Sequence, residues 1–313
     1  MITSLRRRPG RQDFACSLHC AVKNPLSLYA LALVVTAALL HASWNYLLKK
    51  CGGGIGVLAL SAIVATATLT PFSIYLIFAN HFVFTPLMLG FIVGGGVLHL
   101  AYFLLLDRAY RAGGDLSVVY PLARATGPLI TIIVATMLFD ERMSAIAIAG
   151  AVLIGASAMM LTGNPAKLFG KDARAGAGFA LLCGCMIASY TVWDKQAVAV
   201  LLIPPVVFDW GANLTRIMML TPMAMRREPG AISRAWKDHR KTVIAIGVMS
   251  PLSYILVLTA MVFTPVSYVA PARELSILFA ALLGAHVLKE GDATRRSIAA
   301  LGMVLGVSGL ALG

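Results

Sequence analysis

The stretch SVVYPLAR, residues 117–124, decides the fold of this chain, because it returns as SYVAPAR at residues 267–273. In both copies a serine is followed four positions later by a proline and shortly afterwards by an arginine. A second motif returns in the same order: Ala-Ser-Trp at 42–44 and Ala-Ser-Tyr at 188–190 are each followed, five positions on, by a lysine. The back half of the chain therefore repeats the front half.

The composition assigns the chain to a class before any motif is interpreted. Hydrophobic residues make up 59% of the 313 residues, charged residues make up only 12%, and the mean hydropathy is +0.84. Such a chain has too little polar surface to cover a soluble globule. The apolar runs are continuous rather than alternating, which predicts spanning helices and argues against a barrel. We therefore expect an all-α membrane protein.

Each repeat contains about five apolar segments long enough to cross a bilayer. An odd number of spans places the second repeat upside down relative to the first, which is the inverted-repeat layout of secondary transporters. The first five-helix repeat is expected over residues 28–163 and the second over 175–313, with ten transmembrane helices in total. The predicted spans are 28–48, 55–78, 87–106, 117–139 and 143–162, then 175–194, 205–225, 242–262, 266–288 and 295–312.

Residues 1–27 stand apart from the two repeats. They include Arg6, Arg7 and Arg8 and lack the apolar core of a signal peptide, so we expect a disordered basic tail. The chain shows no set of four well-spaced metal ligands, so neither a metal nor a cofactor is expected.

The net charge of +13 does not indicate nucleic-acid binding, because the basic residues lie in loops between apolar spans rather than on one folded face. They concentrate in the loops that follow odd-numbered spans. The positive-inside rule then predicts that these loops face the cytoplasm and that both termini lie outside. We expect a multi-pass protein of the inner (plasma) membrane, present as a monomer or homodimer.

Ionisable side chains inside a predicted span normally face a partner or a water-filled cavity, because a charge in hydrocarbon is costly. Arg124 and Arg273 occupy equivalent positions, each shortly after a proline that interrupts the backbone hydrogen bonds. Two guanidinium groups near a helix start would bind an anion, so we expect them to flank a central cavity and to hold a carboxylate or phosphate-like group. The alternative is structural, with Arg273 neutralising Glu274 or another acid and Arg124 extending to an interface.

Further polar and aromatic side chains are predicted to face this cavity. In the first span His41 and Asn45 follow a helical spacing of four, with Trp44 beside them. In the third span His99 and Tyr102 share one face. Interfacial anchoring for Trp44 and a hydrogen bond to a neighbouring helix for His99 are the structural alternatives.

Glu274 is the only acid that we place well inside the membrane, since Asp194 and Lys195 are expected near the water boundary. It is therefore the natural carboxylate for proton coupling, although the adjacent arginine opposes easy protonation. The candidate substrate-binding residues are Arg124, Arg273, Trp44, Asn45, Tyr102, Tyr120, Tyr190 and Tyr254, and the candidate coupling residues are Glu274, His41 and His99.

The motifs resemble one known family, the EamA-like branch of the drug/metabolite transporter superfamily. The resemblance rests on His-Ala-Ser-Trp-Asn at 41–45, Tyr-Pro-Leu-Ala-Arg at 120–124, Asp-Glu-Arg at 140–142 and Ala-Pro-Ala-Arg-Glu at 270–274, followed by Lys-Glu at 289–290. It implies ten helices in two inverted five-helix repeats. It also implies movement of small metabolites, amino acids or drugs, mostly outward.

These observations predict a secondary transporter of a small anionic or zwitterionic metabolite, such as an amino acid, that works by alternating access, and the resemblance implies that it exports this metabolite. Its partners would be this small-molecule substrate, the lipid bilayer and possible coupling protons, with no nucleic acid. The alternative is proton-coupled multidrug or cation efflux, which the small multidrug relatives perform with a carboxylate in their first helix; the first span here has none. The sequence contains no HExxH, Ser-His or Walker motif, so neither an enzyme nor an ATP-driven pump is expected.

Overall fold

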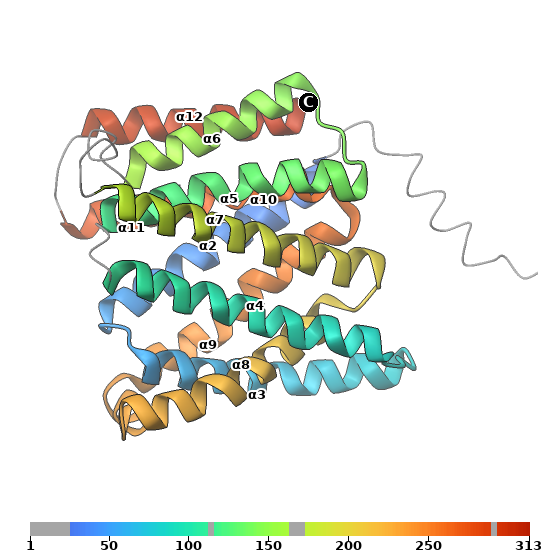
Figure 1. Cartoon of the computed structure of the whole chain (residues 1–313), viewed down its shortest axis with the longest axis vertical. Helices are drawn as coiled ribbons and strands as arrows, with labels where there is room; N and C mark the ends of the chain where they lie inside the picture. The colour runs from blue at the N-terminus through green and yellow to red at the C-terminus, as the bar shows by residue number, and fades with distance from the viewer. Residues whose placement is uncertain (1–25, 112–115, 163–172, 289–292) are drawn as a thin grey trace, which may run out of the picture.

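The computed structural model describes residues 26–111, 116–162, 173–288 and 293–313. In these ranges the chain forms helices and no strand (Figure 1). The helices are α2 (Leu28–Lys50), α3 (Ile55–Ala79), α4 (Pro86–Arg111), α5 (Leu116–Phe139), α6 (Ala145–Thr162), α7 (Ala173–Lys195), the short π-helix η2 (Gln196–Val200), α8 (Pro205–Arg227), α9 (Ala231–Phe263), α10 (Val266–Ala272), α11 (Leu275–Leu288) and α12 (Ala293–Leu312).

The predicted spans coincide with these helices, with two differences. The span expected at 266–288 is divided into α10 and α11, and the span expected at 242–262 is the second part of the longer α9, which kinks at His239. Of the predicted basic tail, residues 1–25 lie outside the described residues. Ser27 belongs to the fold, because its hydroxyl caps the start of α2 by accepting a hydrogen bond from the backbone N–H of Ala30 at 3.2 Å.

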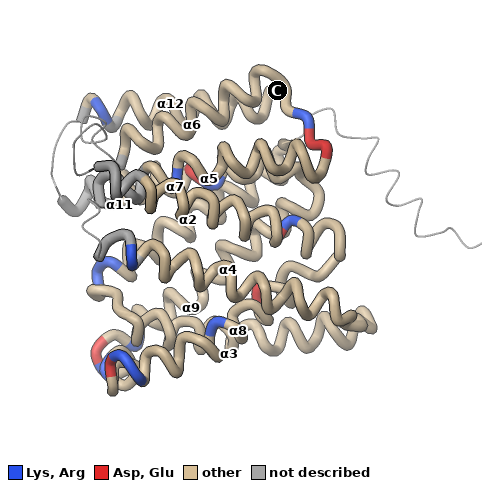
Figure 2. Tube along the Cα trace, in the orientation of Figure 1, with Lys and Arg blue, Asp and Glu red and all other residues tan. Residues whose placement is uncertain are grey.

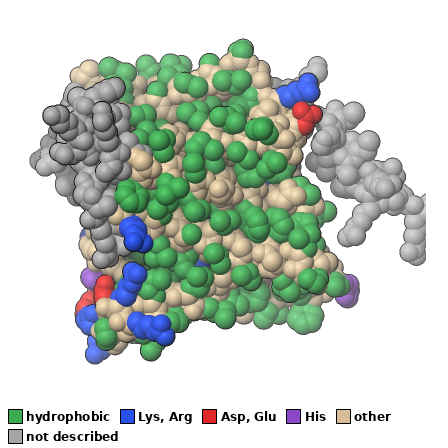
Figure 3. Space-filling model, viewed as in Figure 1, with side chains coloured by type: hydrophobic (Ala, Val, Ile, Leu, Met, Phe, Trp, Pro, Cys, Tyr) green, Lys and Arg blue, Asp and Glu red, His purple; other side chains and the backbone are tan. Residues whose placement is uncertain are grey.

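The chain is a multi-pass membrane protein. Within the described ranges, six segments are long and apolar enough to cross a membrane: Leu28–Lys50, Ile55–Ala79, Pro86–Leu106, Leu122–Phe139, Ala231–Phe263 and Val266–Leu283. Large apolar side chains such as Phe78 and Met137 are about three-quarters exposed, and Figure 3 shows apolar side chains spread over the visible face. A soluble monomer rarely exposes so much contiguous apolar surface. The count of ten spans and the inversion of the repeats stay predictions.

The neighbours of each helix correspond between the two halves. α4 packs against α7, and its counterpart α9 packs against α2; α5 packs against α7, and its counterpart α11 packs against α2. In the same way α4 contacts α8 while α9 contacts α3. α6 and α12 pack against each other at one end of the molecule (Figure 1). A two-fold relation between the halves would produce these reciprocal contacts.

Three consecutive glycines allow α4 to approach its neighbours closely. A Cβ atom added at Gly94 would lie 2.5 Å from a ring carbon of Trp193, and one added at Gly95 would lie 2.8 Å from the ring of Phe208. At Gly96 the obstacle would be the backbone of α8 at 2.7 Å. Only glycine permits these contacts, which place α4 against both α7 and α8.

The second copy of the proline-arginine motif breaks its helix. After Pro271 the chain leaves α10, and the backbone N–H of Glu274 bonds to the Pro271 carbonyl at 3.0 Å, one residue short of the α-helical spacing. The first copy does not break, because Pro121 lies in the opening turns of the continuous α5. Arg273 therefore sits at a helix break, whereas Arg124 sits within a regular helix.

The charged side chains at the helix ends are unevenly distributed. Figure 2 shows that Lys and Arg gather towards one end of the helices. Exposed examples end α2, at Lys49 and Lys50, and end α8, at Arg226 and Arg227. This arrangement is what the positive-inside rule requires of a cytoplasmic face.

Candidate functional site: the central cavity

A cavity of about 150 Å³ lies between the two halves of the protein. Its walls come from α2, α4, α5, α7, α8, α9 and the break between α10 and α11. A smaller pocket of about 20 Å³ continues from it and shares five of its residues: His41, Arg124, Ser253, Tyr254 and Arg273. Elements far apart in the sequence thus supply a single polar chamber in an otherwise apolar bundle.

The structure brings most of the predicted site residues to this cavity. Trp44, Asn45, Tyr102, Tyr190, Tyr254, His41, His99, Arg124 and Arg273 all line it. Glu274 lies behind the wall in contact with Arg124, and the side chain of Tyr120 lies outside the described residues. The roles of these residues in binding or coupling stay predictions.

Arg124 is a buried residue that is held by the opposite half of the protein. Its Nε lies 3.0 Å from Oε2 of Glu274, and its Nη2 donates to the hydroxyl of Ser276 at 3.0 Å. The structural alternative above is therefore wrong in its pairing: Glu274 neutralises Arg124 rather than its neighbour Arg273. Arg124 does not extend to an interface either, because its side chain is only 9% exposed.

Arg273 differs from Arg124 in having no acidic partner. No carboxylate of the described residues lies within ion-pairing distance of its guanidinium group. Its guanidinium carbon instead lies 5.6 Å from the centre of the Tyr254 ring, within range of a cation–π contact. The backbone break after α10 directs this positive charge to the cavity wall.

A second buried ion pair lies on α8. Nη2 of Arg216 is 3.5 Å from Oδ1 of Asp209, and the amide of Asn213 donates to the other carboxylate oxygen at 2.9 Å. Asp209 is almost completely buried, so Glu274 is not the only acid in the interior of the helix bundle. The helical spacing of Asp209, Asn213 and Arg216 was a signal for this cluster, because it places all three on one face.

Asp194 is also a buried acid, and its expected place at the water boundary is wrong. Its Oδ2 lies 2.9 Å from Nε2 of His99 and also accepts a hydrogen bond from the Tyr254 hydroxyl. The neighbouring Lys195 is buried as well, and its ammonium donates to the carbonyls of Met261 at 2.7 Å and Thr264 at 3.0 Å. Lys195 thus satisfies the C-terminal end of α9 and does not face the cavity.

Aromatic rings form the remaining wall of the cavity. The rings of His41 and Trp44 meet edge to face at 5.0 Å between centroids, and the Asn45 amide donates to the His41 carbonyl at 2.7 Å. The ring of Tyr190 lies 4.3 Å from that of His99. These rings offer a flat apolar surface beside the charged groups, which suits a substrate with a small organic body.

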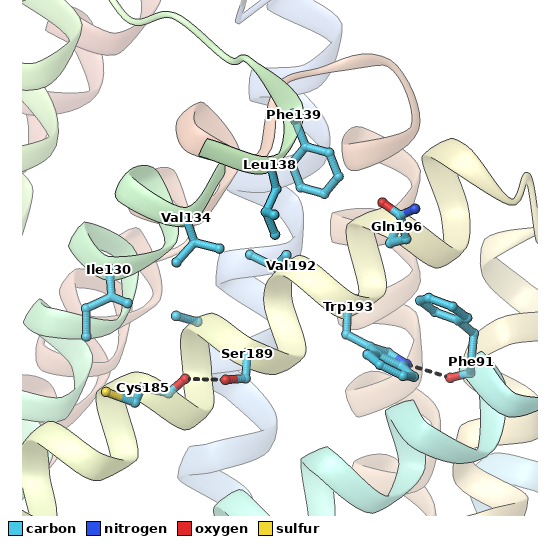
Figure 4. A pocket seen from close by; sticks show the side chains of 11 residues that line it. Phe91, Ile130, Val134, Leu138, Phe139, Cys185, Ser189, Val192, Trp193 and Gln196 are labelled. Atoms are coloured by element: carbon cyan, nitrogen blue, oxygen red, sulfur yellow. Dashed lines mark hydrogen bonds between the residues drawn. The ribbon is translucent and has the colours of Figure 1, made fainter. Parts of the chain in front are cut away.

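A larger hollow of about 550 Å³ opens elsewhere, between α4, α5 and α7 (Figure 4). Two of its polar groups are already used: the indole N–H of Trp193 donates to the Phe91 carbonyl at 2.8 Å, and the Ser189 hydroxyl donates to the Cys185 carbonyl at 2.8 Å. The amide of Gln196 also lines it, and the other labelled side chains are mostly apolar. A groove with so few polar groups and no charged one suits lipid chains better than a charged substrate. We therefore take the smaller central cavity as the candidate site.

Glu141 has a structural role at the start of α10. Its two carboxylate oxygens accept the backbone N–H groups of Val266 and Ser267, each at 2.9 Å, at the start of α10. This side chain therefore caps the helix that leads to Arg273. Among the residues that the structure describes, no group of three or more His, Cys, Asp or Glu side chains could hold a metal ion.

The comparisons with known proteins agree with this architecture. Residues 174–312 match the model of the EamA-like transporter family. No match is found among the curated proteins. Matches among solved structures number 29 chains, and one of them, a crystal structure of a protein, has a TM-score of 0.70 over 90% of this chain and 97% of the other. The two sequences are 18% identical, so this likeness shows the fold alone.

Proposed function

We propose that the chain exports a small anionic or zwitterionic metabolite, such as an amino acid, by alternating access. The match of residues 174–312 to the EamA-like transporter family supports this proposal. The family consists of membrane transporters of the drug/metabolite transporter superfamily and not of enzymes. The outward direction and the inner (plasma) membrane are expectations that follow from the family resemblance. The reciprocal helix contacts of the two halves support an inverted repeat around the central cavity.

The unpaired charge of Arg273 is the observation that carries the proposal. Two of the three cavity arginines are neutralised, Arg124 by Glu274 and Arg216 by Asp209. Arg273 faces the cavity without such a partner in the described part of the chain. A buried cation normally requires an anion, so a substrate carboxylate or phosphate-like group would supply the missing charge.

The size of the cavity favours a metabolite over a drug. Sites for drug-sized ligands occupy about 300–1,000 Å³, whereas this cavity measures about 150 Å³. An unpaired arginine would also repel a cationic drug. Cation efflux is the competing function. The thermal-stabilisation screen separates it from anion transport.

A thermal-stabilisation screen of the purified protein in detergent tests this proposal. The compounds are amino acids, dicarboxylates, inorganic phosphate, phosphonates and lipophilic cations, and a bound compound should raise the melting temperature. We expect anionic or zwitterionic compounds to stabilise the wild type but not the Arg273→Ala variant. Arg142→Ala, which removes an exposed arginine from the loop after α5, is the matched control and should respond as the wild type does.

Two results would overturn the proposal. Stabilisation of the wild type and Arg273→Ala by lipophilic cations alone would favour multidrug efflux. Equal stabilisation of both proteins by the same anion would mean that Arg273 does not bind it. A stabilising compound would then be tested for counterflow in proteoliposomes, since a transporter should exchange it across the membrane without consuming it.

A further inference from the structure

We propose that Asp194, His99 and Tyr254 form a proton-binding site that couples proton movement to transport, an inference that rests on the function proposed above. The three residues come from α7, α4 and α9, so the site joins helices of both halves. The sequence did not indicate this site, because Asp194 seemed to belong to the end of its span. Only the packing of α4, through its glycines, brings His99 to the carboxylate.

The hydrogen bonds within this site define where a proton can bind. Oδ2 of Asp194 is 2.9 Å from Nε2 of His99 and accepts the hydroxyl of Tyr254, and that hydroxyl lies 3.1 Å from the same Nε2. An ionised carboxylate only accepts hydrogen bonds, so Nε2 of His99 carries its hydrogen toward Asp194. The other ring nitrogen, Nδ1, then has a free lone pair on a side chain that lines the cavity.

The second carboxylate oxygen of Asp194 supplies an independent reason to expect proton binding at this site. Asp194 is fully buried, and its Oδ1 has no hydrogen-bond partner among the described residues. Leaving a carboxylate oxygen buried without a donor is costly. One proton taken from cavity water, at Oδ1 or at Nδ1 of His99, changes the charge of the site from minus one to zero. No oxidant, reductant or second reactant is needed.

The ligands of this site suit a proton rather than a metal cation. The site contains one carboxylate, one phenol hydroxyl and one imidazole, whereas hard cations require about six oxygen ligands. The metal-ligating side chains in the described ranges do not form a cluster here. A sodium gradient should therefore not replace a proton gradient.

The phenol of Tyr254 connects the proton site with the proposed substrate site. Its hydroxyl bonds to Asp194, and its ring lies 5.6 Å from the guanidinium carbon of Arg273. Proton uptake removes a negative charge that partly offsets Arg273, so the cavity should then bind an anion more tightly. By linkage the bound anion strengthens proton binding equally, so proton and anion move together, and export then requires an outward substrate gradient large enough to overcome an inward proton gradient.

Other ionisable groups surround this site on the helices packed against it. The positively charged ones are Arg124 on α5, Lys195 on α7, Arg216 on α8 and Arg273 at the end of α10. The remaining ones are His41 on α2, Tyr190 on α7, Asp209 on α8 and Glu274 before α11. Four of these are already engaged in the two ion pairs, Arg124 with Glu274 and Arg216 with Asp209. A fifth, Lys195, donates to carbonyls at the end of α9. Asp194 thus differs from Glu274 and Asp209 in having no arginine or lysine as its ion-pair partner among the described residues.

The direct test measures proton uptake by the purified full chain without any substrate. The pH of a weakly buffered solution is lowered from about 8 to about 5, the range in which histidine sites respond, and an indicator dye reports the protons bound. Asp194→Asn should bind about one proton fewer than the wild type. Asp140→Asn, which removes an exposed carboxylate, is the matched control and should lose none in this range.

The result is decisive even if Asp194→Asn fails to fold. His99→Gln keeps an N–H donor for Asp194 but removes the titratable ring, so it should show the same loss of uptake. The proposed proton site would be refuted if every folded variant of Asp194 and His99 took up as many protons as the wild type.

A transport assay then separates coupling from transport itself. Proteoliposomes are given a mixture of radiolabelled L-amino acids, and accumulation driven by a pH gradient is compared with counterflow at equal pH. Asp194→Asn should keep counterflow and lose gradient-driven accumulation by about tenfold. Accumulation that survives in Asp194→Asn, or that follows a sodium gradient in the wild type, would refute coupling at this site. Absence of counterflow in the wild type, with proton uptake intact, would contradict only the proposed substrate class.

Discussion

Replacing Arg124 by methionine removes one charge from a buried pair and leaves the other without a partner. The Nε of Arg124 and Oε2 of Glu274 are 3.0 Å apart, and their side chains are only 9% and 5% exposed. At an effective dielectric constant of about 20, two unit charges at this distance attract each other by about 5.5 kcal/mol. Loss of one partner of a buried pair typically costs about 3–5 kcal/mol, because the remaining charge stays buried.

The same substitution at Arg273 should cost much less stability. Arg273 has no ion-pair partner among the described residues, so its loss removes only the contact with the Tyr254 ring. Such a cation–π contact is worth about 0.5–2 kcal/mol. The two arginines, which occupy equivalent places in the repeats, should therefore separate into a structural residue and a binding residue.

Thermal unfolding of the detergent-purified variants measures this difference. At roughly 2 °C per kcal/mol, Arg124→Met should lower the melting temperature by about 6–10 °C and Arg273→Met by about 1–4 °C. The double variant Arg124→Met/Glu274→Met should recover most of the loss, because an apolar pair can replace a buried ion pair. Arg142→Met removes an exposed charge and should have the same melting temperature as the wild type.

The distinction between a structural Arg124 and a binding Arg273 is refuted if Arg124→Met has the melting temperature of the wild type. It is also refuted if Arg273→Met is destabilised as strongly as Arg124→Met. It also fails if the double variant is less stable than either single variant. In that case Glu274 would have another partner that compensates for the loss of Arg124.

Two further substitutions test contacts that position the cavity. Gly94→Val should destabilise the protein by about 1–3 kcal/mol, since a Cβ atom there would lie 2.5 Å from Trp193; Gly90→Val on the same helix meets no atom within 4 Å and is the control. Equal melting temperatures for the two glycine variants would contradict close packing of α4 on α7. Glu141→Ala should cost about 0.5–2 kcal/mol by removing the cap of α10. Asp140→Asn, on the exposed neighbour, should be neutral, because asparagine tolerates the positive φ of 50° at this position; a reversed order would refute the cap.

The helices and the polar positions were largely predictable, because both depend on local composition. A membrane-length apolar run must be helical to satisfy its backbone, so the spans could be located from hydropathy. Polar residues such as His41, His99 and Arg124 interrupt those runs, and a polar side chain in a span is expected to face inward. The structure places all three around one cavity.

The partners of these residues were not predictable in the same way. Glu274 follows Arg273 directly, which suggested a pair, yet successive side chains on a helix point in different directions and the break after α10 separates them further. The carboxylate meets Arg124 of the other half instead. Likewise Asp194 lies beside Lys195 in the sequence, but the two side chains reach different helices.

The sequence by itself thus determined the membrane class, the repeated order of segments and the set of polar side chains that had to avoid lipid, since each follows from hydropathy and spacing along the chain. Only the tertiary structure decided which charges are matched: Arg124 with Glu274, Arg216 with Asp209, and Arg273 with none of the described acids. The physical reason is that an ion pair depends on atoms a few ångströms apart. That distance is set by the rotation and approach of packed helices, which residues far away in the sequence control.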